Sequence, residues 1–156
     1  KENIEIMSIK TFKGKMAHLD VLRIRLSTPD GKTGYMIRKF EAIGTSPSGT
    51  TQESTLQCFT NLEGGIGATA TATINFDNPQ LLGVVYYETN SGTADFGGQT
   101  IIFDATKFNQ DIYITHASGG DAINFYLELE QVSLDLNEAT VATLKDMRGN
   151  YTNKDP

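Results

Sequence analysis

The sequence predicts an all-β protein: a single β-sandwich, jelly-roll-like, with about nine strands and a short C-terminal helix. Three observations predict this class. Apolar and polar residues alternate with period two in several runs, as in strands that bury one face. Glycine is abundant, at 15 of 156 residues, and turn-forming residues separate the runs. Helical spacing is confined to one segment near the end of the chain.

Two long runs carry the clearest strand signal. In Ala68–Phe76 every even position is apolar and every odd position is polar, and Ile123–Leu134 alternates in the same way from Ile123 to Glu130. Each run therefore predicts a strand with one dry face and one wet face. Together with a shorter run, they predict one sandwich core made of Ile74, Phe76, Ile112, Ile114, Ile123, Phe125, Leu127 and Leu129.

Seven shorter runs complete the predicted strands: Ile4–Phe12, Leu19–Leu26, Tyr35–Ile43, Thr55–Thr60, Leu81–Glu88, Gln99–Phe103 and Asp111–His116. The alternation changes face near Met7, which predicts a bulge there. Pro29 and the Asp30-Gly31 pair predict a turn that joins the second and third strands as a hairpin.

The helix is expected over 137–148. Asn137 is a suitable N-cap, Glu138 lies where the helix dipole favours an acid, and Gly149 is a natural residue after the last turn. The polar tail 149–156 is expected to fray. We find no internal repeat and no shift in composition, so residues 1–156 are expected to form one domain. Initiator Met is normally removed only before a small residue, and Lys1 is not small. We therefore expect that further residues precede Lys1 in the protein and are missing from this sequence.

Charge is distributed unevenly along the chain. Residues 1–40 hold nine bases and four acids, a sum of +5, whereas residues 41–156 hold four bases and fifteen acids, a sum of −11. The net charge of −6 argues against general nucleic-acid binding. The basic end predicts either an ordinary solvated surface or a docking face for an acidic partner, including a neighbouring copy. Its candidate partner-binding residues lie in the first predicted hairpin: Arg23, Arg25, Arg38 and Lys39.

The residues that usually carry chemistry are few. Cys58 lies in an apolar strand, which is typical of a buried structural thiol, and His116 is expected to be solvated at a strand end. Glu128 and Glu130 share one strand face at a spacing of roughly 7 Å that glycoside hydrolysis can use, but alternating acids more often keep a sheet soluble. No motif predicts a cofactor or a metal ion, although Asp104, Asp111 and Asp121 flank loops where Ca²⁺ can bind.

A carbohydrate-binding module is an alternative. Sandwiches that bind sugars usually stack them on exposed aromatic rings, and this chain has no Trp. The aromatic residues available for that role are Tyr86, Tyr87, Tyr113 and Tyr126.

Several stretches resemble small structural proteins encoded by marine tailed bacteriophages: Phe108–His116, Asn124–Glu130, Ala142–Arg148, Glu2–Ile6 and Phe76–Pro79. The resemblance implies a non-enzymatic virion component that assembles in the host cytoplasm, binds the major capsid protein or other virion proteins, and forms a homo-oligomer. Capsid decoration is the expected role, because decoration proteins are often such sandwiches. A tail-tube or neck component is the next candidate. No membrane or sequence-specific nucleic-acid partner is expected.

Overall fold

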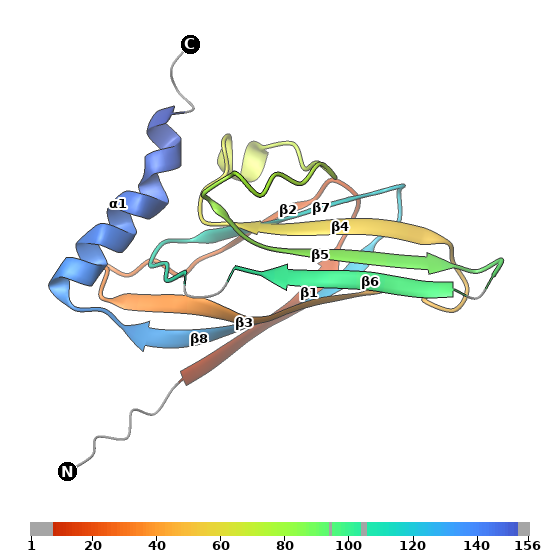
Figure 1. Cartoon of the computed structure of the whole chain (residues 1–156), viewed down its shortest axis with the longest axis horizontal. Helices are drawn as coiled ribbons and strands as arrows, with labels where there is room; N and C mark the ends of the chain where they lie inside the picture. The colour runs from red at the N-terminus through yellow and green to blue at the C-terminus, as the bar shows by residue number, and fades with distance from the viewer. Residues whose placement is uncertain (1–7, 94, 104–105, 153–156) are drawn as a thin grey trace.

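The computed structural model describes residues 8–93, 95–103 and 106–152, and in these ranges it is mostly β (Figure 1). The strands are β1 (Ser8–Met16), β2 (Val21–Ile24), β3 (Thr33–Gly44), β4 (Gln52–Phe59), β5 (Leu81–Asn90), β6 (Asp95–Ile102), β7 (Ile112–Ser118) and β8 (Ile123–Ser133). A 3₁₀ turn, η1 (Gly65–Gly67), follows β4, and the helix α1 (Leu136–Thr152) follows β8. The predicted bulge at Met7 lies outside the described residues.

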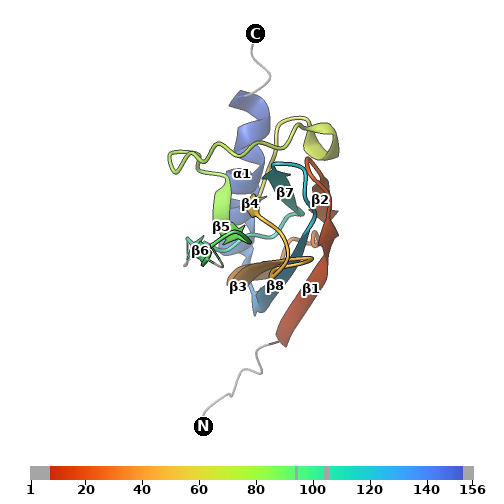
Figure 2. The ribbon, with the colours of Figure 1, turned by 90° about the vertical axis from the view of Figure 1, so that its right-hand side faces the viewer.

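Two antiparallel sheets face each other and confirm the predicted β-sandwich (Figure 2). One sheet has the order β1-β8-β3 and the other has the order β2-β7-β4-β5-β6. The pairs β1/β8, β2/β7 and β4/β5 are nested within one another along the chain, which is the winding of a jelly roll. The nested scheme would pair β6 with β3, but β6 pairs with β5 instead. A side-chain hydrogen bond, from Thr100 Oγ1 to Glu41 Oε1 at 3.0 Å, links β6 to β3.

The core lies between the sheets, as the alternation predicts. Ile112 and Ile114 point inward from β7, and Ile123, Phe125, Leu127 and Leu129 point inward from β8; all six are buried in one cluster. Cys58 is also fully buried in this cluster, as predicted, and burial raises the pKa of its thiol.

The segment Ala68–Phe76 is not a strand, so the described residues form eight strands rather than nine. Ile74 is 40% exposed and Phe76 is 54% exposed, so neither belongs to the core. Gln57, which is buried on β4, donates from Nε2 to the carbonyl oxygens of Thr71 and Thr73, each at 3.1 Å. The segment therefore lies across the outer face of the five-stranded sheet and bonds to a side chain instead of a neighbouring strand. Ala side chains bury too little area to require a place in the core.

The second and third strands do not form a hairpin, because β2 belongs to the five-stranded sheet and β3 to the three-stranded sheet. The predicted turn does exist. Gly31 has φ +66° and donates its N–H to the carbonyl of Thr28 at 3.2 Å. The eight residues from Arg25 to Lys32 are long enough to cross between layers about 10 Å apart. The turn chemistry was predicted correctly, and the identity of the joined strands was not.

The helix begins one residue earlier and ends four residues later than predicted, and it passes through Gly149. Its N-cap is Asp135 rather than Asn137. Asp135 Oδ1 accepts from the N–H of Glu138 at 2.8 Å, and Glu138 Oε1 accepts from the N–H of Asp135 at 3.2 Å. This reciprocal pair is a capping box with acids at both positions. Of the predicted tail, residues 150–152 are helical and residues 153–156 lie outside the described part.

Buried Asn109 fixes the helix to the sandwich. Its Nδ2 donates to the carbonyl of Gly31 at 2.9 Å and contacts the carbonyl of Ala139 at 3.2 Å and the hydroxyl of Thr143 at 2.8 Å. One amide therefore joins the β2–β3 connection to the second turn of α1. This contact places the helix at one end of the sandwich, as Figure 1 shows.

Candidate functional site

The outward side of the three-stranded sheet is the candidate site, and we call it the open face. Strand register places on it, from β1, β8 and β3, the residues Ile9, Thr11, Lys13, Lys15, Asn124, Tyr126, Glu128, Glu130, Met36, Lys39, Glu41 and Ile43. Ile9 is 44% exposed and Ile43 is 52% exposed, one on each edge strand. The helix and the segment over the other sheet lie away from this face (Figure 2). The open face thus offers two aliphatic side chains to solvent across a surface of mixed charge.

Two of the three carboxylates of the open face, Glu128 and Glu130, lie on its central strand, and both have partners within the chain. Arg38 is the extra residue of a bulge in β3, and its guanidinium donates to Glu130 Oε1 at 2.5 Å. The hydroxyl of Tyr126 donates to Glu128 Oε1 at 3.0 Å, and this hydrogen bond raises the pKa of Tyr126. Both acids considered for glycoside hydrolysis are therefore held by neighbouring side chains.

Cations line both edges of the open face. Lys13 and Lys15 lie on β1, and Lys39 lies opposite Glu128 on β3; all three are exposed. Lysines on an edge strand discourage uncontrolled pairing with another strand. They also place positive charge on both edges of the open face, beside the acids of its central strand, and such a pattern can fix the orientation of a charged partner.

The fold separates the four candidate partner-binding residues. Arg38 and Lys39 lie on the strand that borders the open face, whereas Arg23 lies on β2 in the opposite sheet, and Arg25 follows β2 and is exposed. Arg23 donates from Nε at 2.8 Å and from Nη2 at 2.6 Å to Asp111 Oδ2. The Arg23 guanidinium therefore makes an ion pair within the chain. Binding of a partner by any of the four residues stays a prediction.

Asp111 is the centre of that contact. Its Oδ1 accepts the backbone N–H groups of Leu26 at 2.8 Å and Ser27 at 2.9 Å. Burial disfavours the ionised carboxyl, but these two donors and the Arg23 guanidinium outweigh it and hold the pKa of Asp111 at about 2. The carboxylate thus secures the point where the chain leaves β2 to cross between the sheets.

The nested strand order explains why the charge asymmetry is partly neutralised inside the fold. It makes neighbours of the first and last strands, β1/β8, and of the next pair inward, β2/β7. A basic N-terminal quarter and an acidic C-terminal part are therefore brought together. The ion pairs Arg23–Asp111 and Arg38–Glu130 both join these two parts of the sequence. Linear charge counts do not reveal such pairs, because their members are about ninety residues apart.

His116 is fully buried, contrary to the expectation that it is solvated. It contacts the carbonyl of Ala17 through Nδ1 at 2.9 Å and the hydroxyl of Ser54 through Nε2 at 3.0 Å. A neutral imidazole satisfies both contacts if Nδ1 donates and Nε2 accepts. Burial lowers the pKa of His116. Although Ser54 and His116 have the spacing of a nucleophile and its base, both are buried in the sandwich, so they act as a structural polar cluster.

A small hollow of about 210 Å³ lies at the end of the five-stranded sheet. Its lining consists of Thr51, Glu53, Glu88, Thr89, Asn90, Phe96 and Gly97. Glu53 and Glu88 are directly opposite each other on β4 and β5, and exposed Phe96 packs edge to face on Tyr87 at 5.7 Å. Of the predicted stacking residues, Tyr87 is buried and Tyr86, Tyr113 and Tyr126 are half-buried. Phe96, which was not predicted from the sequence, is the exposed ring that lines this hollow.

The described residues contain no group of three His, Cys, Asp or Glu side chains arranged to hold a metal ion. Asp111 is occupied by Arg23, and Asp104 lies outside the described residues. Within the same ranges, no helix has both the length and the apolar character needed to span a bilayer.

Comparison of the chain with protein-family models, with curated proteins and with solved structures found no match.

Proposed function

We propose that this protein is a non-enzymatic structural component of a tailed-phage virion, namely a capsid decoration protein that attaches to the capsid lattice through its open face. The observation that carries the proposal is the open face itself. Two exposed isoleucines on the edge strands flank a central row of paired carboxylates, and lysines form the border. Such a surface combines apolar contact area with charges that set register, which is what docking on a lattice requires.

Two further features support the proposal. The nested strand order is that of jelly rolls, an architecture common in viral capsid domains. The sequence also resembles small structural proteins of marine tailed phages. A tail-tube or neck role uses the same kind of sandwich, and the location of the protein on the virion separates these roles. A decoration protein lies on the capsid surface, whereas a tube or neck protein is confined to the tail or to its junction with the capsid.

Binding of purified protein to particles that lack it tests the proposal. We expect Ile9→Asp together with Ile43→Asp to reduce particle occupancy at least about tenfold, because each change removes buried apolar area worth more than about 1 kcal/mol. Ile66→Asp is the matched control, since Ile66 is an exposed aliphatic residue on η1, away from the open face. If the double variant at Ile9 and Ile43 occupies particles as fully as the Ile66→Asp control does, the open face is not the docking surface. Absence of the protein from purified virions by mass spectrometry would refute the virion proposal.

The hollow beside Phe96 supports a second candidate function, glycan binding. Jelly rolls also serve as lectin domains. Here an exposed ring adjoins carboxylate, hydroxyl and amide groups that can accept or donate hydrogen bonds to sugar hydroxyls. A glycan array, followed by chemical-shift titration of any hit, tests this function. Phe96→Ala should abolish the binding, and retention of binding by that variant would place the sugar elsewhere.

A further inference from the structure

The helix α1 presents its larger apolar side chains to solvent. The residues that it buries against the sandwich are small, Ala139 and Ala142. Leu136, Val141 and Leu144 are 68%, 65% and 63% exposed. A surface helix normally turns its large apolar residues toward the core. This helix therefore has an apolar side that the described part of its own chain leaves uncovered.

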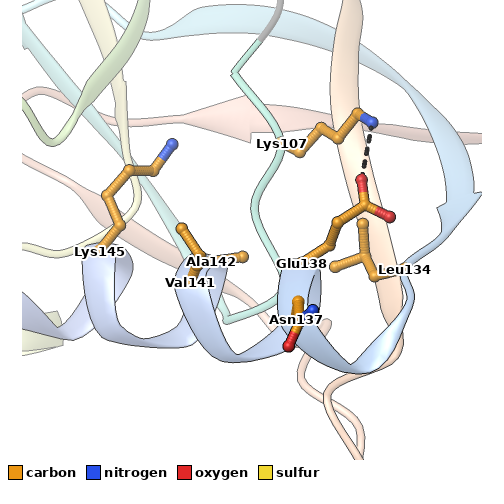
Figure 3. A pocket seen from close by; sticks show the side chains of 7 residues that line it. All are labelled: Lys107, Leu134, Asn137, Glu138, Val141, Ala142 and Lys145. Atoms are coloured by element: carbon orange, nitrogen blue, oxygen red, sulfur yellow. Dashed lines mark hydrogen bonds and ion pairs between the residues drawn. The ribbon is translucent and has the colours of Figure 1, made fainter.

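A groove of about 470 Å³ borders this apolar side at Val141 (Figure 3). Leu134 and Ala142, both buried, are its apolar floor, and Val141 stands at its edge. Lys107 reaches toward Glu138 across one end of the groove, with Nζ 3.4 Å from Oε2. Lys145 lies at the other end, and its ammonium makes no ion pair with any described side chain. The groove is thus apolar in the middle and charged at both ends.

The charges on the helix are complementary to those of an antiparallel copy. Glu138 and Lys145 are seven residues apart, which places them on the same side of an α-helix two turns from each other. A two-fold axis that passes between positions 141 and 142 brings Glu138 of each copy beside Lys145 of the other. The exposed Val141 of each copy then lies beside the axis. A two-fold contact is self-complementary, so each favourable pair occurs twice.

We propose that α1 pairs antiparallel with α1 of a second copy of this chain. Val141 and Leu144 supply the apolar contact, and two symmetric Glu138–Lys145 pairs set the direction. The inference is independent of the virion proposal, because it concerns a different surface and a different partner. A 17-residue helix is about 26 Å long, so this contact is small and the dimer is expected to be concentration-dependent.

Sedimentation velocity between about 5 and 500 μM, where weak dimers dissociate measurably, tests the proposal. Wild-type protein should shift from monomer to dimer over this range. Val141→Asp with Leu144→Asp should raise the dimer Kd at least about 30-fold, because each change places a charge at an aliphatic position that the dimer would bury. Ile66→Asp, another exposed aliphatic residue, should leave Kd unchanged. A wild-type chain that stays monomeric at the top of this range, or an aspartate variant that dimerises normally, overturns the proposal.

Charge reversal gives a test that loss of helix structure cannot imitate. Glu138→Lys and Lys145→Glu should each weaken self-association about tenfold, as expected when two exposed ion pairs become repulsive. A mixture of the two variants should regain wild-type affinity, because in the mixed dimer one helix is basic at both positions and the other is acidic at both. Glu138→Lys also removes the capping box, so circular dichroism should accompany the measurement. Failure of the mixture to associate better than either variant alone refutes the proposed pairing.

Discussion

Removing the charge of Asp111 should destabilise the fold by a predictable amount. Asp111→Asn keeps the shape of the side chain, but it places an amide N–H₂ group among the N–H donors of Arg23, Leu26 and Ser27. A pKa of about 2 in the folded chain, against 3.8 for an unperturbed carboxyl, corresponds to about 2 kcal/mol of stability at neutral pH. Unpaired donors add to this loss, so we expect Asp111→Asn to lower the free energy of unfolding by about 2–4 kcal/mol.

The sign of the pH dependence follows from the lowered pKa. Between pH 4 and pH 2 the unfolded chain binds a proton at Asp111 that the folded chain does not, so the stability due to Asp111 falls with pH across this window. Urea denaturation at pH 7 and at several pH values from 4 to 2 measures the difference between variant and wild type. That difference should shrink as the pH falls.

Exposed Asp77, in the turn directly after the segment Ala68–Phe76, provides the matched control. Asp77→Asn should change the free energy of unfolding by less than about 0.5 kcal/mol, as surface substitutions usually do. The reasoning fails if Asp111→Asn is equally mild at pH 7. It also fails if the gap between Asp111→Asn and wild type stays constant from pH 4 to pH 2.

Three other substitutions address the core, the buried histidine and the helix anchor. Phe125→Ala should cost about 3–5 kcal/mol in urea denaturation, because Phe125 is buried in the main cluster; a loss under about 1 kcal/mol would place it outside the core. Because burial lowers the pKa of His116 below 6.5, the unfolded chain binds a proton at this residue more readily than the folded chain does. The melting temperature should therefore fall as the pH drops below about 6.5, and His116→Gln should make this fall less steep. An unchanged pH dependence in the variant would contradict the prediction. Asn109→Ala should cost about 2–3 kcal/mol by leaving buried acceptors unpaired and should speed hydrogen exchange in α1; unchanged exchange would mean that other contacts hold the helix.

The sequence was sufficient to predict a strand and its buried face where the alternating apolar side chains are large. The strand predicted over Ile123–Leu134 is observed over Ile123–Ser133, and its four inward residues are buried. Bulky aliphatic and aromatic residues lose so much free energy when exposed that their period alone determines which face is buried. The same period in Ala68–Phe76 predicted a strand that does not exist. Small side chains gain little free energy from burial, so the structure of such a segment depends on its tertiary contacts. Here the contact is with Gln57, which donates to the carbonyl oxygens of Thr71 and Thr73.

The open face was found only in part from the sequence. Arg38 and Lys39, which the sequence predicts as partner-binding residues, lie on the strand that borders the open face, and their partner binding stays a prediction. Ile9 and Ile43 were not predicted, because their exposure depends on which strands flank β8. Arg23 pairs with Asp111 within the chain, and its predicted contact with a partner stays a prediction. A charge count along the chain cannot distinguish a base that faces solvent from one that meets an acid about ninety residues away.

The sequence by itself therefore determined the class of the fold, the strands with large alternating side chains, the turn at Thr28–Gly31 and the existence of a C-terminal helix. These are local properties, since each follows from the period, the turn residues or the capping residues of a short segment. The tertiary structure alone decided the strand order, the burial of His116, the internal use of Arg23 and the outward direction of Leu136, Val141 and Leu144. Each of these depends on which distant segment becomes a neighbour, and in a jelly roll the strands nearest the two ends of the chain lie side by side.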